Sequence, residues 1–156
     1  MVRIILCCLL LVPAALYAQT KKIVVPTQNQ VTSAKKPPAS PSKNTVLVSV
    51  ERGKLVYQTY CLACHQADGG GVQNLNPPLV KQWVSGDKSK LIRLLLKGSI
   101  GKVVIDGDYF SNTMPAQANF TDQQIADVLT FMRNNFGFKA SIVTPAEVKA
   151  VRAKTK

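Results

Sequence analysis

The stretch Cys61-Leu62-Ala63-Cys64-His65 decides how the rest of this sequence is interpreted. Two cysteines separated by two residues, with a histidine directly after the second, form the attachment signature of a c-type haem. The spacing suits this chemistry, because two thiols can add across the two vinyl groups of a porphyrin while the adjacent histidine reaches the iron from the same side. We therefore expect one covalently bound haem c, with Cys61 and Cys64 as attachment points and His65 as an iron ligand.

Three other uses of the motif compete with haem: a structural zinc site, a redox-active dithiol and a structural disulfide. Zinc needs four nitrogen or sulfur ligands, but the chain beyond residue 18 contains only two Cys and one His. A thioredoxin-type dithiol is expected in a βαβ setting, whereas the sequence on both sides of the motif has a helical pattern. A disulfide would suit an exported protein, yet it leaves His65 without a role.

The first 18 residues have the pattern of an export signal. Arg3 precedes the apolar run 4–12, and the stretch ends at the small residue Ala18, which is the order of a secretory signal peptide. The apolar part is shorter than the roughly 20 residues that cross a bilayer, so cleavage is favoured over a retained anchor. We expect a periplasmic or other extracytoplasmic location, where haem is attached in such proteins.

Residues 19–49 are expected to form a disordered linker rich in Lys and Pro. The segment has five lysines and four prolines but no acidic, glycine or aromatic residue, so it cannot bury enough apolar surface to offset its ordering entropy. The chain carries a net charge of +12, of which +5 lies in this segment and +6 in residues 50–156. The folded part is therefore not expected to bind nucleic acid, and it should meet a membrane only through a tether or a partner complex.

Capping residues and apolar periodicity predict three helices around the motif. The first runs from about residue 50 to residue 61. Asp87 is a candidate cap for a second helix that ends at Gly98. The capping box in residues 121–124 begins a third helix, with Gly137 as its predicted end.

The remaining segments complete an all-α domain over residues 50–138. Between the second and third helices, residues 102–111 are expected to form a brief hairpin around Asp106-Gly107. Residues 139–156 form a C-terminal extension, with a short helix that starts at the capping box in residues 144–147. The predicted architecture has three to five helices wrapped around one haem.

From about residue 50 to residue 138 the chain resembles the class I monohaem cytochromes c. Gly53 and Tyr57 stand eight and four residues before the first haem cysteine. In that family a glycine and an aromatic residue at these places let the first helix cross closely against the last. The resemblance implies that Gly53 lies near Val128 and Phe131.

The resemblance also implies two further contacts of the haem iron and its histidine. The family has a proline whose carbonyl accepts a hydrogen bond from the proximal histidine, and Pro77 is the best match. Residues 112–116 resemble the loop that supplies the second axial ligand. One departure is Gln66, because many relatives have glycine directly after the histidine; this concerns the local turn.

Elimination points to Met114 as the second iron ligand. His65 is the only histidine, and beyond residue 18 only two methionines remain. Met132 falls on the apolar stripe of the last predicted helix, where a core position is expected. Met114 stands in a loop before Pro115, which favours an extended backbone. His/Met ligation occurs in cytochromes c and raises the reduction potential, and a six-coordinate iron favours electron transfer over catalysis.

The expected function is one-electron transfer by Fe(II)/Fe(III) cycling, without catalysis, between a periplasmic dehydrogenase or reductase and a respiratory partner. Two alternatives are a haem enzyme or gas sensor with a displaceable Met114, and a structural haem subunit of a respiratory complex. The partner is expected to have an acidic docking surface, because some of five lysines that cluster in the sequence should ring the haem edge. The five are Lys81, Lys88, Lys90, Lys97 and Lys102.

Trp83 and Tyr109 are the remaining polar aromatic residues of interest. Each has an N–H or O–H group that can donate a hydrogen bond to a haem propionate. The alternative for each is an ordinary amphipathic core position.

Overall fold

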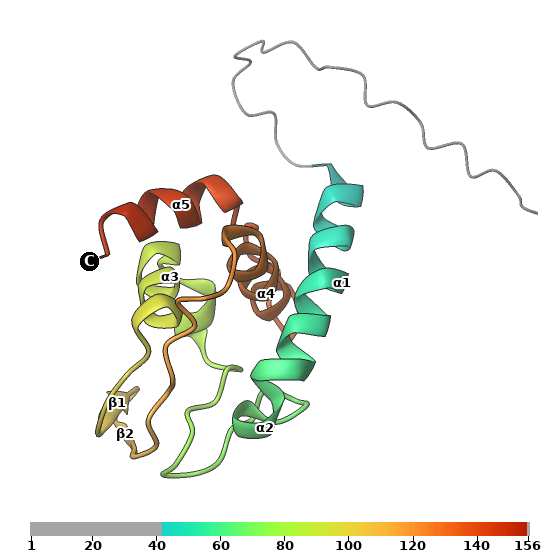
Figure 1. Ribbon diagram of the computed structural model, residues 1–156. Helices are drawn as coiled ribbons and strands as arrows, with labels where there is room; N and C mark the ends of the chain where they lie inside the picture. Colours follow the sequence, from blue (N-terminus) through green and yellow to red (C-terminus); the bar gives the residue numbers. More distant parts are fainter. Residues whose placement is uncertain (1–41, 156) are drawn as a thin grey trace, which may run out of the picture. The chain divides into compact units, whose positions relative to one another are not determined.

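The computed structural model describes residues 42–155, which form five α-helices, one 3-10 helix and a two-stranded hairpin. The predicted signal peptide and most of the predicted linker lie outside the described residues. The all-α class and the predicted range of helices are confirmed. Within residues 42–155, no helix is long and apolar enough to cross a membrane. In chain order the elements are α1 (Lys43–Tyr60), α2 (Leu62–His65), the 3-10 helix η1 (Gln82–Ser85), α3 (Lys88–Lys97), β1 (Val103–Ile105), β2 (Asp108–Phe110), α4 (Asp122–Asn134) and α5 (Pro145–Ala153) (Figure 1).

Helix α1 begins earlier than expected, so the linker prediction is wrong for residues 43–49. The Ser42 side chain caps the helix by accepting a hydrogen bond from the Thr45 backbone N–H at 3.3 Å. About two turns after Ser42, the buried Ser49 hydroxyl donates to Asp127 Oδ1 on α4 at 2.5 Å. A tertiary contact of this kind is invisible to local composition, and it orders a segment that composition alone assigned to the linker.

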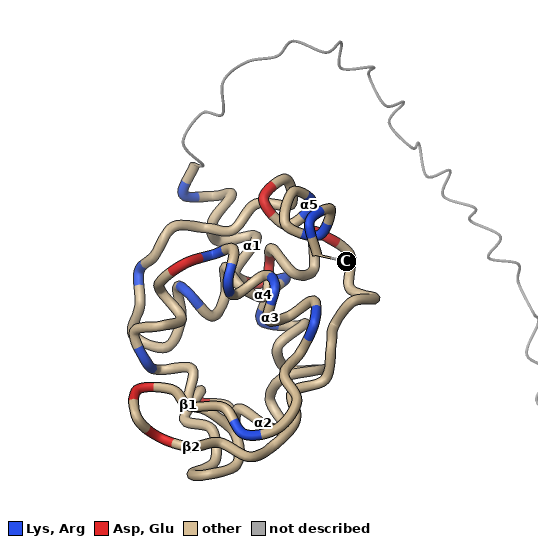
Figure 2. The backbone as a smooth tube through the Cα atoms, turned by 90° about the vertical axis from the view of Figure 1, so that its left-hand side faces the viewer, with Lys and Arg blue, Asp and Glu red and all other residues tan. Residues whose placement is uncertain are grey.

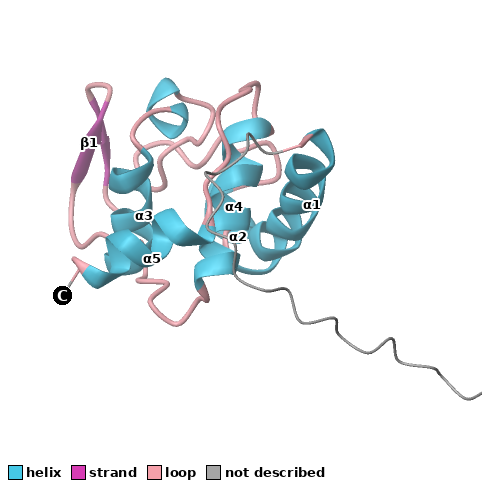
Figure 3. Ribbon diagram, turned by 90° about the horizontal axis from the view of Figure 1, so that it is seen from above, coloured by secondary structure: helices cyan, strands magenta, loops and turns pink. Residues whose placement is uncertain are grey.

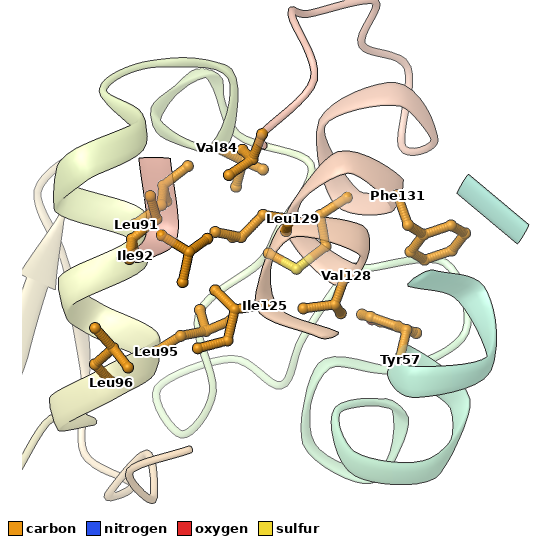
Figure 4. Packing of buried hydrophobic residues seen from close by; sticks show 14 of the residues in the cluster. Tyr57, Val84, Leu91, Ile92, Leu95, Leu96, Ile125, Val128, Leu129 and Phe131 are labelled. Carbon is orange, nitrogen blue, oxygen red and sulfur yellow. The ribbon is translucent and has the colours of Figure 1, made fainter. Parts of the chain in front are cut away.

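Helices α1 and α4 cross at Gly53, as the resemblance implied. A Cβ at Gly53 would overlap the backbone carbonyl of Asp127 and lie 2.8 Å from the Cβ of Phe131. The nearest residue is therefore Asp127, next to the expected Val128. The ring of Tyr57 packs on that of Phe131 at 5.3 Å between centroids (Figure 4). Only a residue without a side chain permits this close approach.

The predicted caps of α3 and α4 are present, but α4 ends before its predicted terminus. Asp87 accepts hydrogen bonds from two backbone N–H groups of the first turn of α3, and Gly98 ends that helix at a φ of 66°. Thr121 and Gln124 form the capping box of α4. Helix α4 stops at Asn134 and not near Gly137. The following Phe136 turns back onto the rings of Tyr57 and Phe131, which takes the chain out of the helix.

The predicted C-terminal helix is confirmed as α5, with its capping box of Thr144 and Glu147. It packs against both α3 and α4, and Val143 and Val148 are fully buried in the common core (Figure 3). Residues 139–155 are therefore an integral part of the fold. Arg152 of this helix donates hydrogen bonds to Asp122 Oδ1 and to two carbonyls that precede α4.

The predicted hairpin is formed by β1 and β2, with Val104 directly opposite Tyr109. Both turn residues have a positive φ, 52° at Asp106 and 89° at Gly107. Asp and Gly tolerate this conformation, which is why the dipeptide marks such turns. The hairpin lies on the side of the molecule away from α1 (Figures 1 and 3).

Candidate functional site

One cleft of the described structure brings together every residue that the sequence analysis assigned to the haem. Its walls come from the end of α1, from α2 and the loop that follows it, from η1, α3 and β1, from the loop between β2 and α4, and from α4. A second cleft, between α3 and α5, contains none of the predicted site residues. The predicted residues that line the first cleft are Cys61, Cys64, His65, Pro77 and Met114.

The haem motif forms one tight helical turn beside this cleft. The backbone N–H groups of Cys64 and His65 both donate to the carbonyl of Cys61, at 3.2 and 2.9 Å. Cys61 and Cys64 are not joined by a disulfide. Burial, together with the neighbouring Cys64, raises the pKa of the Cys61 thiol to about 11.

The imidazole of His65 is oriented by a backbone carbonyl. Its Nδ1 lies 3.0 Å from the carbonyl oxygen of Pro77. Because a carbonyl only accepts, Nδ1 carries the proton, and Nε2 has its lone pair free for a metal. Burial lowers the pKa of His65 despite the opposite effect of the Pro77 hydrogen bond, so the ring is held neutral. The structure thus places Pro77 where the resemblance implied.

Met114 is held beside the end of α3 by its backbone. Its N–H donates to the carbonyl of Ser99 at 3.0 Å, and the Ser99 N–H donates back to the Met114 carbonyl at 2.9 Å. Gly98 is required next to it, because a Cβ there would overlap the Met114 carbonyl oxygen. The Asn112 side chain also donates to Asn76 Oδ1 at 3.1 Å. This bond links the loop of residues 112–116, which contains Met114, to the loop that contains Pro77.

Met132 is buried on α4, as expected, but its side chain also borders the cleft. Both described methionines therefore reach the cleft. They differ in their setting, since Met114 belongs to a loop and Met132 to the packed helix that crosses α1. This difference favours Met114 as the methionine whose sulfur binds a metal. Replacing Met114 and Met132 in turn therefore gives a matched pair of variants for an experiment.

Trp83 lies in the wall of the cleft, whereas Tyr109 lies at the surface of the protein. Trp83 lines the cleft, and its Nε1 is buried with no hydrogen-bond partner in the described residues. A buried donor without an acceptor costs about 1–3 kcal/mol, so this wall fits a ligand that carries an acceptor. Tyr109 is 55% exposed and does not line the cleft. Both of the roles considered for Tyr109, haem donor and core residue, are therefore wrong.

Several walls of the cleft were not foreseen from the sequence. The rings of Tyr60 and Phe120 pack edge to face, 4.8 Å between centroids, and both residues line the cleft. Val103 and Ile105 line it from alternate positions of β1. All three residues of β1 are apolar, so the sequence holds no alternation that could have indicated which face turns inward.

The donor set and its surroundings fit a covalently held haem. Two thiols, one neutral imidazole and one thioether border a mostly apolar cleft, and the Trp83 N–H in its wall is buried without a partner in the described residues. Within residues 42–155, no three His, Cys, Asp or Glu side chains come close enough together to hold a metal ion.

The lysines expected around the haem edge do not line the cleft. Lys88 is engaged elsewhere, because its Nζ lies 2.9 Å from Glu147 Oε1 on α5. Lys88 is therefore not among the lysines free to ring that edge. The other four are exposed on the surface, and lysine and arginine positions are spread over the helices (Figure 2).

Residues 50–136 match the family model described as "Cytochrome c". Cytochrome c-552 of Thermus thermophilus is 31% identical over 104 residues, which cover 60% of this chain and 79% of that protein. The gluconate 2-dehydrogenase cytochrome c subunit of Pantoea cypripedii is 35% identical over 109 residues, covering 65% of this chain and 24% of that subunit. The cytochrome c subunit of the quinone alcohol dehydrogenase of Gluconacetobacter polyoxogenes is 32% identical over 111 residues, with 64% and 22% covered. This chain thus matches about a quarter of each dehydrogenase subunit.

Proposed function

We propose that this chain, which belongs to the cytochrome c family and carries covalently bound haem c, is an exported one-electron carrier with His65 and Met114 as its iron ligands. Cys61 and Cys64 are the proposed attachment points. The haem supplies an iron that takes up and releases one electron. The observation that carries the proposal is that Met114, from a distant part of the chain, lines the same mostly apolar cleft as the local motif of Cys61, Cys64 and His65.

In this proposal the remaining residues of the cleft orient and shield the group. The Pro77 carbonyl fixes the tautomer of His65 by accepting a hydrogen bond from Nδ1 at 3.0 Å. Hydrogen-bond acceptors commonly orient a metal-bound histidine in this way. Trp83 offers its otherwise unpartnered N–H to a propionate. The apolar walls exclude water, so few dipoles reorganise when the electron arrives or leaves. No residue of the cleft is assigned a catalytic role.

The proposed electron donor is a dehydrogenase or reductase outside the cytoplasm, and the proposed acceptor is a respiratory protein. The relatives named as cytochrome subunits of gluconate and alcohol dehydrogenases support a dehydrogenase. With a chain charge of +12, the partner's docking surface is proposed to be acidic. Association should therefore slow as salt rises, because screening weakens electrostatic steering. Stopped-flow rates that are equal at low and moderate ionic strength would contradict an acidic docking surface.

Replacing each cleft methionine in turn tests the iron ligands. In Met114→Ala the haem should stay covalently attached, because Cys61 and Cys64 are untouched. The ferric protein should lose the weak near-infrared band of a methionine–iron bond, and the reduction potential should fall. Met132→Ala is the matched control: it leaves a core cavity that costs roughly 2–5 kcal/mol, but it should keep the band.

Two results would contradict this assignment. Loss of the band in Met132→Ala and its survival in Met114→Ala would make Met132 the ligand. Rapid binding of carbon monoxide to the reduced native protein would show that the methionine is displaceable. That second result would favour the alternative function, a haem enzyme or gas sensor.

A further inference from the structure

The hairpin of β1 and β2 has one face on the cleft and one face on solvent. Val103 and Ile105 line the cleft, and Phe110 on the same side is buried. On the opposite side, Val104 is 58% exposed and Tyr109 is 55% exposed. These two residues are directly opposite each other in the ladder. A solvent face of an antiparallel pair is normally polar, so this apolar pair is surface suited to a contact.

Charges of opposite sign flank this pair along the same strand. Strand β1 is Val103–Ile105, so the exposed Lys102 stands directly before it and the exposed turn residue Asp106 directly after it. A cation and an anion therefore mark the two ends of the strand that presents Val104. The Lys102 Nζ lies 4.7 Å from the centroid of the Tyr109 ring, which fixes the positive charge beside the apolar pair. Acidic positions mark the tip of the hairpin (Figure 2).

We propose that this outer hairpin face docks onto the same face of a second copy of the chain for electron exchange between the two. A two-fold axis through the Val104–Tyr109 pair would place Lys102 of each copy against Asp106 of the other. The same axis would bring the two apolar pairs together. A surface that is self-complementary in this way is what a two-fold contact requires. The inference rests on the proposed electron-carrier function and names one partner for it.

The size and the charge of this surface indicate a transient contact. The hairpin face offers a handful of residues, whereas a stable interface uses about 20–30 on each side. Small interfaces are typical of electron-transfer encounters. Two molecules of charge +12 repel each other in most orientations, but this face carries both signs. Because Val103 and Ile105 form the cleft wall behind it, the contact would bring two haem clefts to opposite sides of the paired hairpins.

Electron self-exchange in the full-length holo-protein tests the proposal. NMR line broadening in mixtures of the oxidised and reduced protein gives the rate constant, at an ionic strength near 0.1 M where the Debye length is about 10 Å. Lys102→Glu sets like charges against each other and should slow exchange by about tenfold. The double variant Lys102→Glu/Asp106→Lys restores opposite charges at both symmetric contacts. It has the native net charge, and its rate should return to within about twofold of the native value.

Two further variants separate the hairpin face from exposed apolar surface in general. Tyr109→Ser should slow exchange, whereas Leu55→Ser should not, although Leu55 on α1 is 64% exposed. A double charge variant as slow as Lys102→Glu, or equal rates in all variants, would overturn the inference. Reduction by ascorbate and reoxidation by ferricyanide are measured alongside. Failure of the native protein to cycle would overturn the proposed function itself, whereas normal cycling with unaltered self-exchange would overturn only the docking face.

Discussion

Replacing Gln66 by glycine is expected to stabilise the protein. Gln66 follows α2 with a φ of 66° and a ψ of 166°, a conformation that is essentially restricted to glycine. Holding another residue there costs about 1–3 kcal/mol. Glycine removes this strain but makes the unfolded chain more flexible, which opposes the gain by about 0.4–1 kcal/mol.

The contacts of Gln66 change this balance very little. Its side chain donates one weak, exposed hydrogen bond to the Ala63 carbonyl, at 3.4 Å. The stronger contact, from the Tyr57 hydroxyl at 2.7 Å, is to the backbone carbonyl of residue 66 and is kept in any variant. The free energy of unfolding should therefore rise by about 1 kcal/mol, which is a rise of roughly 3–6 °C in Tm for a domain of this size.

Urea and thermal unfolding of the holo-protein would measure the change, with Gln66→Ala as the matched control. Alanine removes the same side-chain hydrogen bond but keeps the Cβ, so its stability should stay within about 0.5 kcal/mol of the native protein. A glycine variant no more stable than the alanine variant would refute the reasoning, because the Cβ would then cause no strain.

Two further outcomes test the helix crossing and the attachment of α5. Gly53→Val should lower the free energy of unfolding by at least roughly 1–3 kcal/mol, the usual cost of overpacking, because its Cβ meets the Asp127 backbone; Lys54→Ala on the exposed side should be nearly neutral in the same melts. For Glu147, burial alone would raise the pKa, but the hydrogen bonds from Lys88 and Thr144 outweigh it and hold the pKa below 4.5. The carboxylate therefore adds stability above its unfolded-state pKa, and this contribution is lost as the pH falls through the lower folded-state value. In parallel unfolding series, Glu147→Gln should be less stable than the native protein by under about 1 kcal/mol at pH 6 and should match it at pH 3; a difference that persists in acid would exclude this ionised pair as its cause.

The parts of the fold that could be predicted are those written in short sequence patterns. The capping boxes at Thr121 and Thr144 and the Asp106-Gly107 turn each depend on residues within four positions of one another. The haem motif is also local, since Cys61, Cys64 and His65 occupy one helical turn. For such features the hydrogen-bond partners are near in sequence, so residue type and spacing suffice.

The sequence does not predict the features that depend on contacts between residues far apart in the chain. The start of α1 depends on Ser49 and its buried partner Asp127, which are 78 positions apart. The end of α4 depends on Phe136 folding back onto Tyr57. Tyr109 was considered for the haem or the core, but the register of β1 and β2 turns it to solvent. A shift of one residue in this register would have turned it inward.

One wall of the cleft is held by the chain beyond the family match. Arg133 on α4 is 3% exposed and donates hydrogen bonds to the carbonyls of Val84 and Gly86, at 3.0 and 2.8 Å, and of Ser141, at 3.0 Å. The first two carbonyls belong to the turn that carries Trp83. Burial lowers the pKa of Arg133, yet a guanidinium stays charged, and these carbonyls replace its lost water. Because the match ends at residue 136, Ser141 connects the Trp83 wall to a segment outside it, and α5 then closes the core over that segment.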